Sequence, residues 1–240
     1  MYTHKFKVFV DFDGTITKFD VGEAIFREFG SAAETDKIVA DLIINKITAR
    51  KCWELLFATI KQIDVVKFDE FIDSMNIDTT FHQFHNYCCV KDIDIFVLSD
   101  GFDYYINRIL KKENLNHVKL FANKLIINAK NELVPSFPYF DIECQTSANC
   151  KRNHILNNSG DEEFTVYIGD GNSDKYSTQF CDFIFAKDYL LKYCEKERIT
   201  FFPFKNFDDI IVRLESLRTK KRLKKRYQAE LKRKEIYLQE

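Results

Sequence analysis

Four short segments, far apart in the chain, carry the residue types that phosphoryl transfer needs. They are Asp11–Thr15 (DFDGT), Leu98–Gly101 (LSDG), Cys150–Arg152 (CKR) and Gly169–Asp174 (GDGNSD). In the first and last segments, carboxylates follow an apolar run and are themselves followed by glycine. Crowded carboxylates repel one another, so a site that gathers them is expected to hold a cation. The four segments predict an enzyme active site.

The residue types suit hydrolysis of a phosphate monoester, whose charged phosphoryl group must be stabilised between two oxygens. A carboxylate nucleophile divides the reaction into two displacements through an aspartyl-phosphate. A second carboxylate two residues later points to the same side of an extended chain and can act as acid and then as base. Magnesium lets the anionic groups approach, while a serine hydroxyl and a lysine ammonium can hold the phosphoryl oxygens.

The elements that position these segments are apolar strands that alternate with helical patterns. The main strands are predicted at Phe6–Val10, Ile93–Leu98 and Phe164–Ile168, with shorter ones at Val118–Phe121, Phe183–Phe185 and Thr200–Phe202. Such alternation indicates an α/β fold with a Rossmann-like, doubly wound parallel sheet. Ligands bind beyond the carboxyl ends of the strands of such sheets, where all four segments are expected.

The segment between the first two main strands is far longer than the dozen or so residues that a crossover needs. Its apolar spacing predicts helices at Val21–Phe29, Ala32–Lys46, Ala49–Gln62 and Thr80–Val90. The excess length indicates an inserted helical subdomain. Further along, Asn123–Val134 is expected to form a hairpin that Pro135 ends.

In order and spacing, the four segments resemble motifs I to IV of the haloacid dehalogenase (HAD) superfamily over about the first 210 residues. The helical insert resembles the C1 cap of that superfamily. The resemblance implies that Asp11 is the nucleophile and Asp13 the general acid and base, that Ser99 and Lys151 bind the phosphoryl group, and that Asp11, Asp13 (through its carbonyl), Asp170 and Asp174 form the Mg²⁺ site.

Within the superfamily the chain is similar to the phosphoserine-phosphatase-like branch, and more closely to its methionine-salvage phosphatases. The residues that carry this similarity are Asp11–Thr17 with Asp20, the cysteine-bearing segment Cys144–Lys151, and Phe185–Leu191. The implied substrate is 2-hydroxy-3-keto-5-methylthiopentenyl-1-phosphate, with phosphoserine or another small phosphomonoester as the alternative. Asp20 replaces the substrate-reading glutamate of phosphoserine phosphatases, and Asp100 replaces a motif II glycine. Both are expected to lie at the substrate.

Simpler interpretations exist for each site residue. Asp11 and Asp13 could form a turn at a strand end, Ser99 could cap a helix and Lys151 could be a solvated helix residue. The order of the four motifs favours the catalytic interpretation. His82 and His85 with Cys88 and Cys89 could suggest zinc, but their spacing matches no structural zinc pattern, and a partly buried helix is favoured. For Arg50, a place on an exposed face is slightly favoured over contact with a substrate anion.

The charge is unevenly distributed along the 240 residues. The whole chain has a formal net charge of −1, whereas residues 212–240 hold eleven Lys/Arg and four Asp/Glu. We expect a core at residues 1–18 and 92–215, a cap at 19–91 and a basic helical tail at 216–240 that protrudes. Use of this tail by a non-catalytic module to bind anionic polymers or membranes is the alternative of another class.

Composition fits a globular enzyme of a reducing compartment. The seven cysteines are odd in number and scattered, which disfavours a disulfide framework. The N-terminus shows no signal-peptide pattern, and no apolar stretch is long enough for a bilayer span. We therefore expect a cytoplasmic protein. Because a cap that closes over the site leaves little room for a protein or a nucleic acid, we also expect a small-molecule substrate and no nucleic-acid partner.

Overall fold

The computed structural model describes residues 4–144 and 147–238. The chain divides into two compact units, which are described separately below. The first unit comprises Met1–Asp11, Asp78–Leu98 and Lys151–Glu240, and the second comprises Phe12–Ile77 and Ser99–Cys150. The division into core, cap and tail expected from the sequence stays a prediction.

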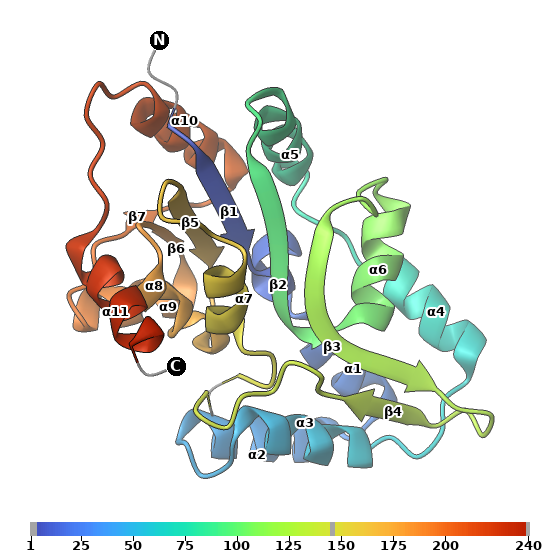
Figure 1. The fold of residues 1–240 in the computed structure, drawn as a ribbon. Coiled ribbons are helices and arrows are strands. Elements are labelled where there is room, and N and C mark those ends of the chain that lie inside the picture. Colours follow the sequence, from blue (N-terminus) through green and yellow to red (C-terminus); the bar gives the residue numbers. More distant parts are fainter. Residues whose placement is uncertain (1–3, 145–146, 239–240) are drawn as a thin grey trace. The chain divides into compact units, whose positions relative to one another are not determined.

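The first unit is built on a parallel sheet whose strands run in the order β2-β1-β5-β6-β7 (Figure 1). The strands are β1 (Phe6–Val10), β2 (Asp94–Phe102, which continues into the second unit), β5 (Phe164–Gly169), β6 (Phe183–Ala186) and β7 (Phe202–Pro203). The chain leaves β1 for β2 and returns to the other side of β1 at β5. The strand order therefore reverses beside β1, which is where ligands bind in such sheets.

Strand β1 is buried from Val8 to Val10 because these residues are apolar on both faces. Val8, Phe9 and Val10 are fully buried, as expected for a parallel strand covered on both sides. The rings of Phe9 and Phe96 stack with centroids 5.2 Å apart, which joins β1 to β2 across their parallel register. Packing of this kind makes the end of β1 a rigid platform for the residue that follows, Asp11.

The helices of the first unit pack in groups. Helix α5 lies beside α10, while α7 and α11 both contact α8 (Figure 1). The helical elements of this unit are α5 (Thr80–Val90), α7 (Lys151–Asn157), the 3₁₀ turn η2 (Asn172–Asp174), α8 (Ser177–Phe180), α9 (Asp188–Lys196), α10 (Phe207–Arg218) and α11 (Tyr227–Tyr237).

The basic tail does not protrude, so that expectation is wrong. Helix α11 packs on α8, and its Ala229 is fully buried. Arg233 of α11 lies 3.2 Å from a carboxylate oxygen of buried Asp182 and donates to the carbonyl of Phe180 at 2.9 Å. Arginine side chains that reach buried backbone acceptors hold this segment against the first unit.

The second unit begins with helices whose starts are readable from the sequence. They are α1 (Val21–Phe29), α2 (Ala32–Ile43), α3 (Ala49–Ala58) and α4 (Val65–Ser74). Each follows an Asp, Ser or Thr whose side chain accepts a backbone N–H from the first turn: Asp20, Ser31, Thr48 and Asp64. These caps satisfy donors that the first turn leaves without intrahelical partners. The helix α4 is absent from the sequence prediction.

The remaining elements of the second unit are the turn η1 (Phe12–Ile16), in which the backbone angles of Asp13 and Gly14 are not helical, helix α6 (Asp103–Lys112) and the antiparallel strands β3 (Lys119–Ile127) and β4 (Leu133–Ser136). The predicted hairpin is therefore present. Pro135 lies inside β4, opposite Leu125, rather than ending the strand. Strand β2 also extends further than predicted, so Ser99 and Asp100 belong to it rather than to a loop after it.

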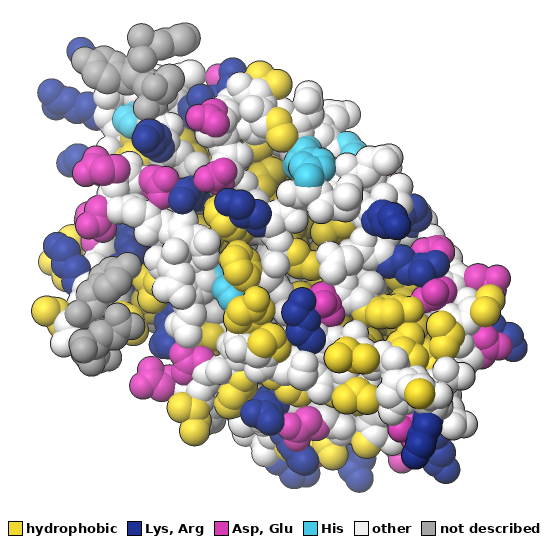
Figure 2. Space-filling model, turned by 45° about the vertical axis from the view of Figure 1, so that its right-hand side comes forward, with side chains coloured by type: hydrophobic (Ala, Val, Ile, Leu, Met, Phe, Trp, Pro, Cys, Tyr) yellow, Lys and Arg dark blue, Asp and Glu magenta, His cyan; other side chains and the backbone are white. Residues whose placement is uncertain are grey.

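Charged side chains of both signs are interspersed on the face drawn in Figure 2. Among the described residues, none of the helices is both long and apolar enough to span a membrane.

Candidate active site

In the first unit, three carboxylates gather at the ends of neighbouring strands. Asp11 follows β1, and its backbone N–H donates to the carbonyl of Ile168 in β5 at 2.9 Å. Asp170 follows β5, and Asp174 ends the short turn η2. Each of the three offers a carboxylate oxygen, and these oxygens lie within 4.8 Å of one another. We call these residues, with Lys151, the Asp11 cluster.

The cation of this cluster is the buried ammonium of Lys151. Its Nζ donates to Asp11 Oδ1, and also to Asp174 Oδ1 at 2.6 Å and to the Ser173 hydroxyl at 3.1 Å. The lysine is only 1% exposed. Burial alone would lower the pKa of Lys151, but the charges of Asp11 and Asp174 outweigh it and raise that pKa. Lys151 therefore stays protonated and supplies positive charge beside Asp11.

The carboxylate of Asp174 accepts four hydrogen bonds, which fix its position and hold the donor groups around it. Lys151 and the Tyr167 hydroxyl donate to Oδ1, whereas the backbone N–H groups of Asp170 and Gly171 donate to Oδ2 at 3.1 and 2.9 Å. Gly169 permits this arrangement, because a Cβ there would lie 2.4 Å from Asp174 Oδ2. The segment Gly169–Asp174 thus folds back so that its backbone N–H groups donate to its own last residue, Asp174.

The donor set of the Asp11 cluster fits a divalent cation. Magnesium prefers oxygen ligands and is usually held by one or two carboxylates with waters and substrate oxygens. Burial raises the pKa of Asp11; Lys151 opposes this, and the charges of Asp174 and Asp170 add to it. One ammonium against three carboxylates leaves an excess of negative charge. A cation held by Asp11 and Asp170 would remove that excess and keep Asp11 ionised.

In the second unit, the side chain of Asp13 is surrounded by three hydrogen-bond donors. The backbone N–H of Val21 donates to Oδ1 at 3.0 Å, while the hydroxyls of Tyr105 and Ser99 donate to Oδ2 at 2.7 and 3.2 Å. Gly101 makes room for this network, since a Cβ there would lie 1.7 Å from the Tyr105 hydroxyl oxygen. We call this group the Asp13 cluster.

The pKa of Asp13 is raised to about 7, mainly by burial and then by the negative charge of Asp20. The three hydrogen bonds from Tyr105, Val21 and Ser99 lower that pKa but do not outweigh the burial. A carboxyl group that titrates near neutrality is suited to donate a proton in one step and to accept one in the next.

Asp20 and Asp100, both expected at the substrate, make defined protein contacts. Asp20 is exposed and caps α1 by accepting the N–H of Glu23 at 2.8 Å. Both carboxylate oxygens of Asp100 accept protein donors, from helix α3 and from residues 147–149. Within their unit, Asp13 and Ser99 are brought together, with the charge of Asp20 close enough to raise the pKa of Asp13.

Two tyrosines at these clusters are absent from the sequence-based site. Tyr105 lies in the first turn of α6, and Tyr167 lies in the buried strand β5. Both hydroxyls are buried and donate to aspartates of the motifs. A tyrosine within a few residues of a motif is the signal that could have pointed to them, because buried tyrosine hydroxyls usually find a partner.

The other candidates from the sequence have different surroundings. The guanidinium of Arg50 lies over the rings of Phe137 and Phe140 and pairs with Glu54 at 3.0 Å. Among the described residues, the Asp11 cluster is the one group of three or more potential metal ligands close enough to share an ion. The histidines and cysteines of α5 are therefore part of a helix that packs on α10.

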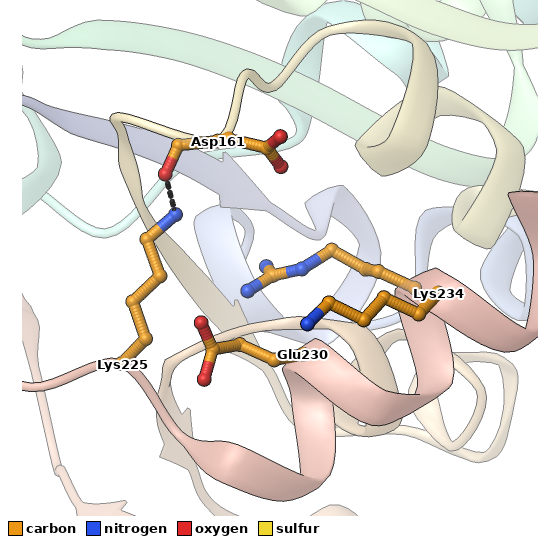
Figure 3. Close-up of a pocket in the computed structure, with 5 residues that line it drawn as sticks. Asp161, Lys225, Glu230 and Lys234 are labelled. Atoms are coloured by element: carbon orange, nitrogen blue, oxygen red, sulfur yellow. Dashed lines mark hydrogen bonds between the residues drawn. The ribbon is translucent and has the colours of Figure 1, made fainter.

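A separate pocket of about 310 Å³ lies beside the tail of the first unit and is lined by Asp161, Lys225, Glu230, Arg233 and Lys234. In Figure 3, the Lys225 side chain reaches the Asp161 carbonyl and Glu230 faces the lysines of its own segment. None of these residues belongs to the Asp11 cluster. Four of the five lining residues belong to the tail, and one of them, Arg233, is engaged with Asp182.

Comparisons with known proteins agree with this geometry. Residues 6–199 match the family model described as "Putative Phosphatase". The chain is 29% identical over 215 residues to the 2-hydroxy-3-keto-5-methylthiopentenyl-1-phosphate phosphatase of Bacillus mycoides (strain KBAB4), covering 88% of this chain and 96% of that protein. It is 27% identical, with the same coverage, to the enzyme of that name from Bacillus cereus (strain B4264).

Solved structures of similar fold include two phosphoserine phosphatases. One carries an analogue of the phospho-aspartyl intermediate, with a TM-score of 0.67, 20% identity and coverage of 88% of this chain and 99% of that chain. The other is a substrate complex, with a TM-score of 0.66, 21% identity and coverage of 87% and 98%. These likenesses confirm the α/β HAD fold. The chain belongs to the "Putative Phosphatase" family and is a phosphomonoester hydrolase of the HAD type.

Proposed function

We propose that this protein is a magnesium-dependent phosphatase that hydrolyses a small phosphomonoester through an aspartyl-phosphate formed on Asp11. The observation that carries the proposal is the Asp11 cluster, where three carboxylate oxygens lie within 4.8 Å of one another beside one buried lysine. Magnesium, when bound there, would neutralise charge between the anionic nucleophile and the anionic substrate.

The first displacement falls to Asp11. Its backbone is fixed between β1 and β5, and its carboxylate contacts the Lys151 ammonium. One carboxylate oxygen attacks phosphorus, and the bond from phosphorus to the ester oxygen breaks. Lys151 and the hydroxyl of Ser99 are proposed to hold the phosphoryl oxygens, because cationic and hydroxyl donors stabilise the charge of the transferred group.

Proton transfer is assigned to Asp13, whose pKa of about 7 suits both directions. In its protonated form it gives a proton to the departing ester oxygen. As a carboxylate it then takes a proton from the water that attacks the phosphorus of the aspartyl-phosphate. The chain places it two residues after Asp11, which is the spacing that puts two side chains on one side of an extended segment.

For the substrate we propose 2-hydroxy-3-keto-5-methylthiopentenyl-1-phosphate, on the basis of the names of the curated relatives. Phosphoserine is the second candidate, on the basis of the fold neighbours alone. A helical cap that closes over a site excludes water and admits small molecules. We further propose a cytoplasmic location, since none of the seven cysteines, all within the described residues, forms a disulfide.

The test is a panel of phosphomonoesters that includes both candidates and a generic aryl phosphate, assayed with purified protein and Mg²⁺. Asp11→Asn should abolish turnover while the fold, followed by circular dichroism, is kept. Asp13→Asn should lower kcat by about 100- to 10,000-fold and let radiolabelled phosphate accumulate on the protein. Substantial turnover by Asp11→Asn would exclude Asp11 as nucleophile. Inactivity of the native protein on the whole panel would exclude the phosphatase function.

A further inference from the structure

The carboxylate of Asp100 links two parts of the second unit through hydrogen bonds. We call this set of contacts the Asp100 junction. Its Oδ1 accepts three donors: the Ser147 hydroxyl at 2.7 Å and the backbone N–H groups of Ala148 and Asn149 at 2.6 and 2.8 Å. Its Oδ2 accepts the indole N–H of Trp53, in helix α3, at 3.1 Å. One side chain thus holds both a loop segment and a helix of the insert.

The same loop segment is also tied to the residue before Asp100. The side-chain amide of Asn149 donates to the carbonyl of Ser99 at 2.7 Å and to the carbonyl of Phe121 at 2.9 Å. The amide of Asn123 donates to the carbonyl of Asp100 at 2.7 Å. Ser99 and Asn149 are fully buried. Asn149 stands two residues before Lys151 in the chain, so the segment that Asp100 fixes leads directly into the catalytic lysine.

Trp53 extends these contacts to the helices of the insert through its aromatic ring. Its ring meets Phe102 edge to face with centroids 5.1 Å apart and lies 5.8 Å from the ring of Phe26 in α1. Helices α1 and α3 are therefore attached through one indole to the strand that bears Ser99. A glycine at position 100 would offer none of the four acceptor contacts that the carboxylate makes.

We propose that Asp100 is a positioning residue that fixes the segment before Lys151 through Oδ1 and fixes helix α3 through Trp53 and Oδ2. Its role in the reaction is to hold Ser99 and the segment that precedes Lys151 in place, and to couple both to the insert. The carboxylate itself does not contact the substrate, because its two oxygens are engaged by four protein donors. The catalytic part of this proposal rests on the proposed phosphatase function.

Fluorescence tests the junction without any substrate. Trp53 is the one tryptophan of the chain, so the intrinsic emission excited at the red edge of absorption reports on its indole alone. Excitation of indole moves electron density away from the five-membered ring. A carboxylate beside Nε1 therefore lowers the energy of the excited state relative to the ground state. In Asp100→Asn the emission should therefore shift to shorter wavelength, whereas a loosened, solvent-exposed indole would emit at longer wavelength. An unchanged spectrum would overturn the contact.

Kinetics test the positioning role. Asp100→Gly should lower kcat by about 10- to 100-fold, the cost of a small misplacement of catalytic groups, and change KM little. The matched control is Asp103→Asn, which removes a carboxylate that binds Lys124 and the N–H of Leu125 in the same unit and should keep native kcat. A folded Asp100→Gly protein with native kcat would overturn the positioning role.

A double variant covers the case in which Asp100→Gly does not fold. In Asp100→Asn, the amide oxygen can keep the three loop donors while the amide N–H faces the indole N–H, a repulsive pair of donors. Trp53→Phe removes that pair, so the double variant should recover kcat at least about threefold relative to Asp100→Asn, as expected for coupled neighbours. Equal kcat in both would overturn the junction. If the native protein has no activity, the proposed function fails. The fluorescence measurement still tests the hydrogen bond between Trp53 and Asp100.

Discussion

The hydroxyl of Tyr105 donates a 2.7 Å hydrogen bond to Oδ2 of Asp13, and the tyrosine is only 1% exposed. Together with the hydrogen bonds from Ser99 and Val21, this bond holds the Asp13 side chain in one preferred orientation. Positioned proton donors work through geometry as much as through pKa. Tyr105 is therefore a residue on which turnover should depend.

Tyr105→Phe should lower kcat roughly 10-fold, equal to about 1.4 kcal/mol, the size expected for the loss of one hydrogen bond. The substrate KM should change little, because the hydroxyl binds Asp13. Steady-state kinetics on the best substrate measure both constants. Tyr104→Phe is the matched control, since that hydroxyl binds Asp69 at 2.7 Å instead. Equal kcat values for the two variants would contradict the role of Tyr105.

Magnesium should stabilise the folded protein as well as activate it. Binding of Mg²⁺ to the folded state alone adds about 2.7 kcal/mol to the free energy of unfolding when the ion is at 100 times its Kd. The physical reason is relief of the repulsion between the carboxylates. Chelation should abolish turnover, and added Mg²⁺ should restore it and raise Tm. Asp170→Asn should lose most of the shift in Tm, whereas Glu162→Gln, which removes an exposed acid, should keep it. A full shift in Asp170→Asn would exclude Asp170 as a ligand.

Stability should fall in mild acid because of His154. This side chain is 5% exposed, and burial lowers its pKa to about 4 from 6.5. The unfolded chain therefore takes up a proton between these values while the folded protein does not. The free energy of unfolding should drop as pH falls from about 6.5 to 4, by about 3 kcal/mol for this group.

Denaturant titrations at several pH values measure that slope. His154→Gln should show a shallower loss of stability than the native protein across the same window, whatever its stability at neutral pH. The exposed His117→Gln serves as control and should reproduce the native slope. Parallel curves for the native protein and His154→Gln would show that His154 does not cause the acid sensitivity.

The docked tail should contribute to stability and not to turnover. Arg233→Ala removes the ion-pair partner of the buried Asp182 carboxylate, which keeps its hydrogen bonds from Thr165 and from the backbone N–H of Arg226. Loss of one partner of a buried ion pair costs about 3 kcal/mol. Thermal and denaturant unfolding should show this loss, with kcat kept at temperatures where the variant is folded. Lys232→Ala, on the same helix but in a surface pair with Glu235, should have little effect. Native stability in Arg233→Ala would mean that the tail is not held through this pair.

The sequence by itself determined the reaction class and the sheet. Apolar β-rich runs such as Phe6–Val10 end at polar residues, and helix caps such as Asp20 and Ser31 mark the starts of α1 and α2. These signals are local, because they depend on neighbouring residues and on the periods of strand and helix. The four ordered motifs supplied the candidate residues for the same reason: each motif is contiguous.

Only the tertiary structure decided which partners those residues meet. Tyr105 and Asp13 are 92 residues apart in the chain, and nothing local to either requires their contact. Asp100 was expected at the substrate, yet its oxygens are engaged by Trp53 and by residues 147–149, because hydrogen-bond partners are set by how distant elements pack. The tail was expected to protrude, but two arginines reach buried acceptors. Long-range packing, which no sequence period encodes, made each of these choices.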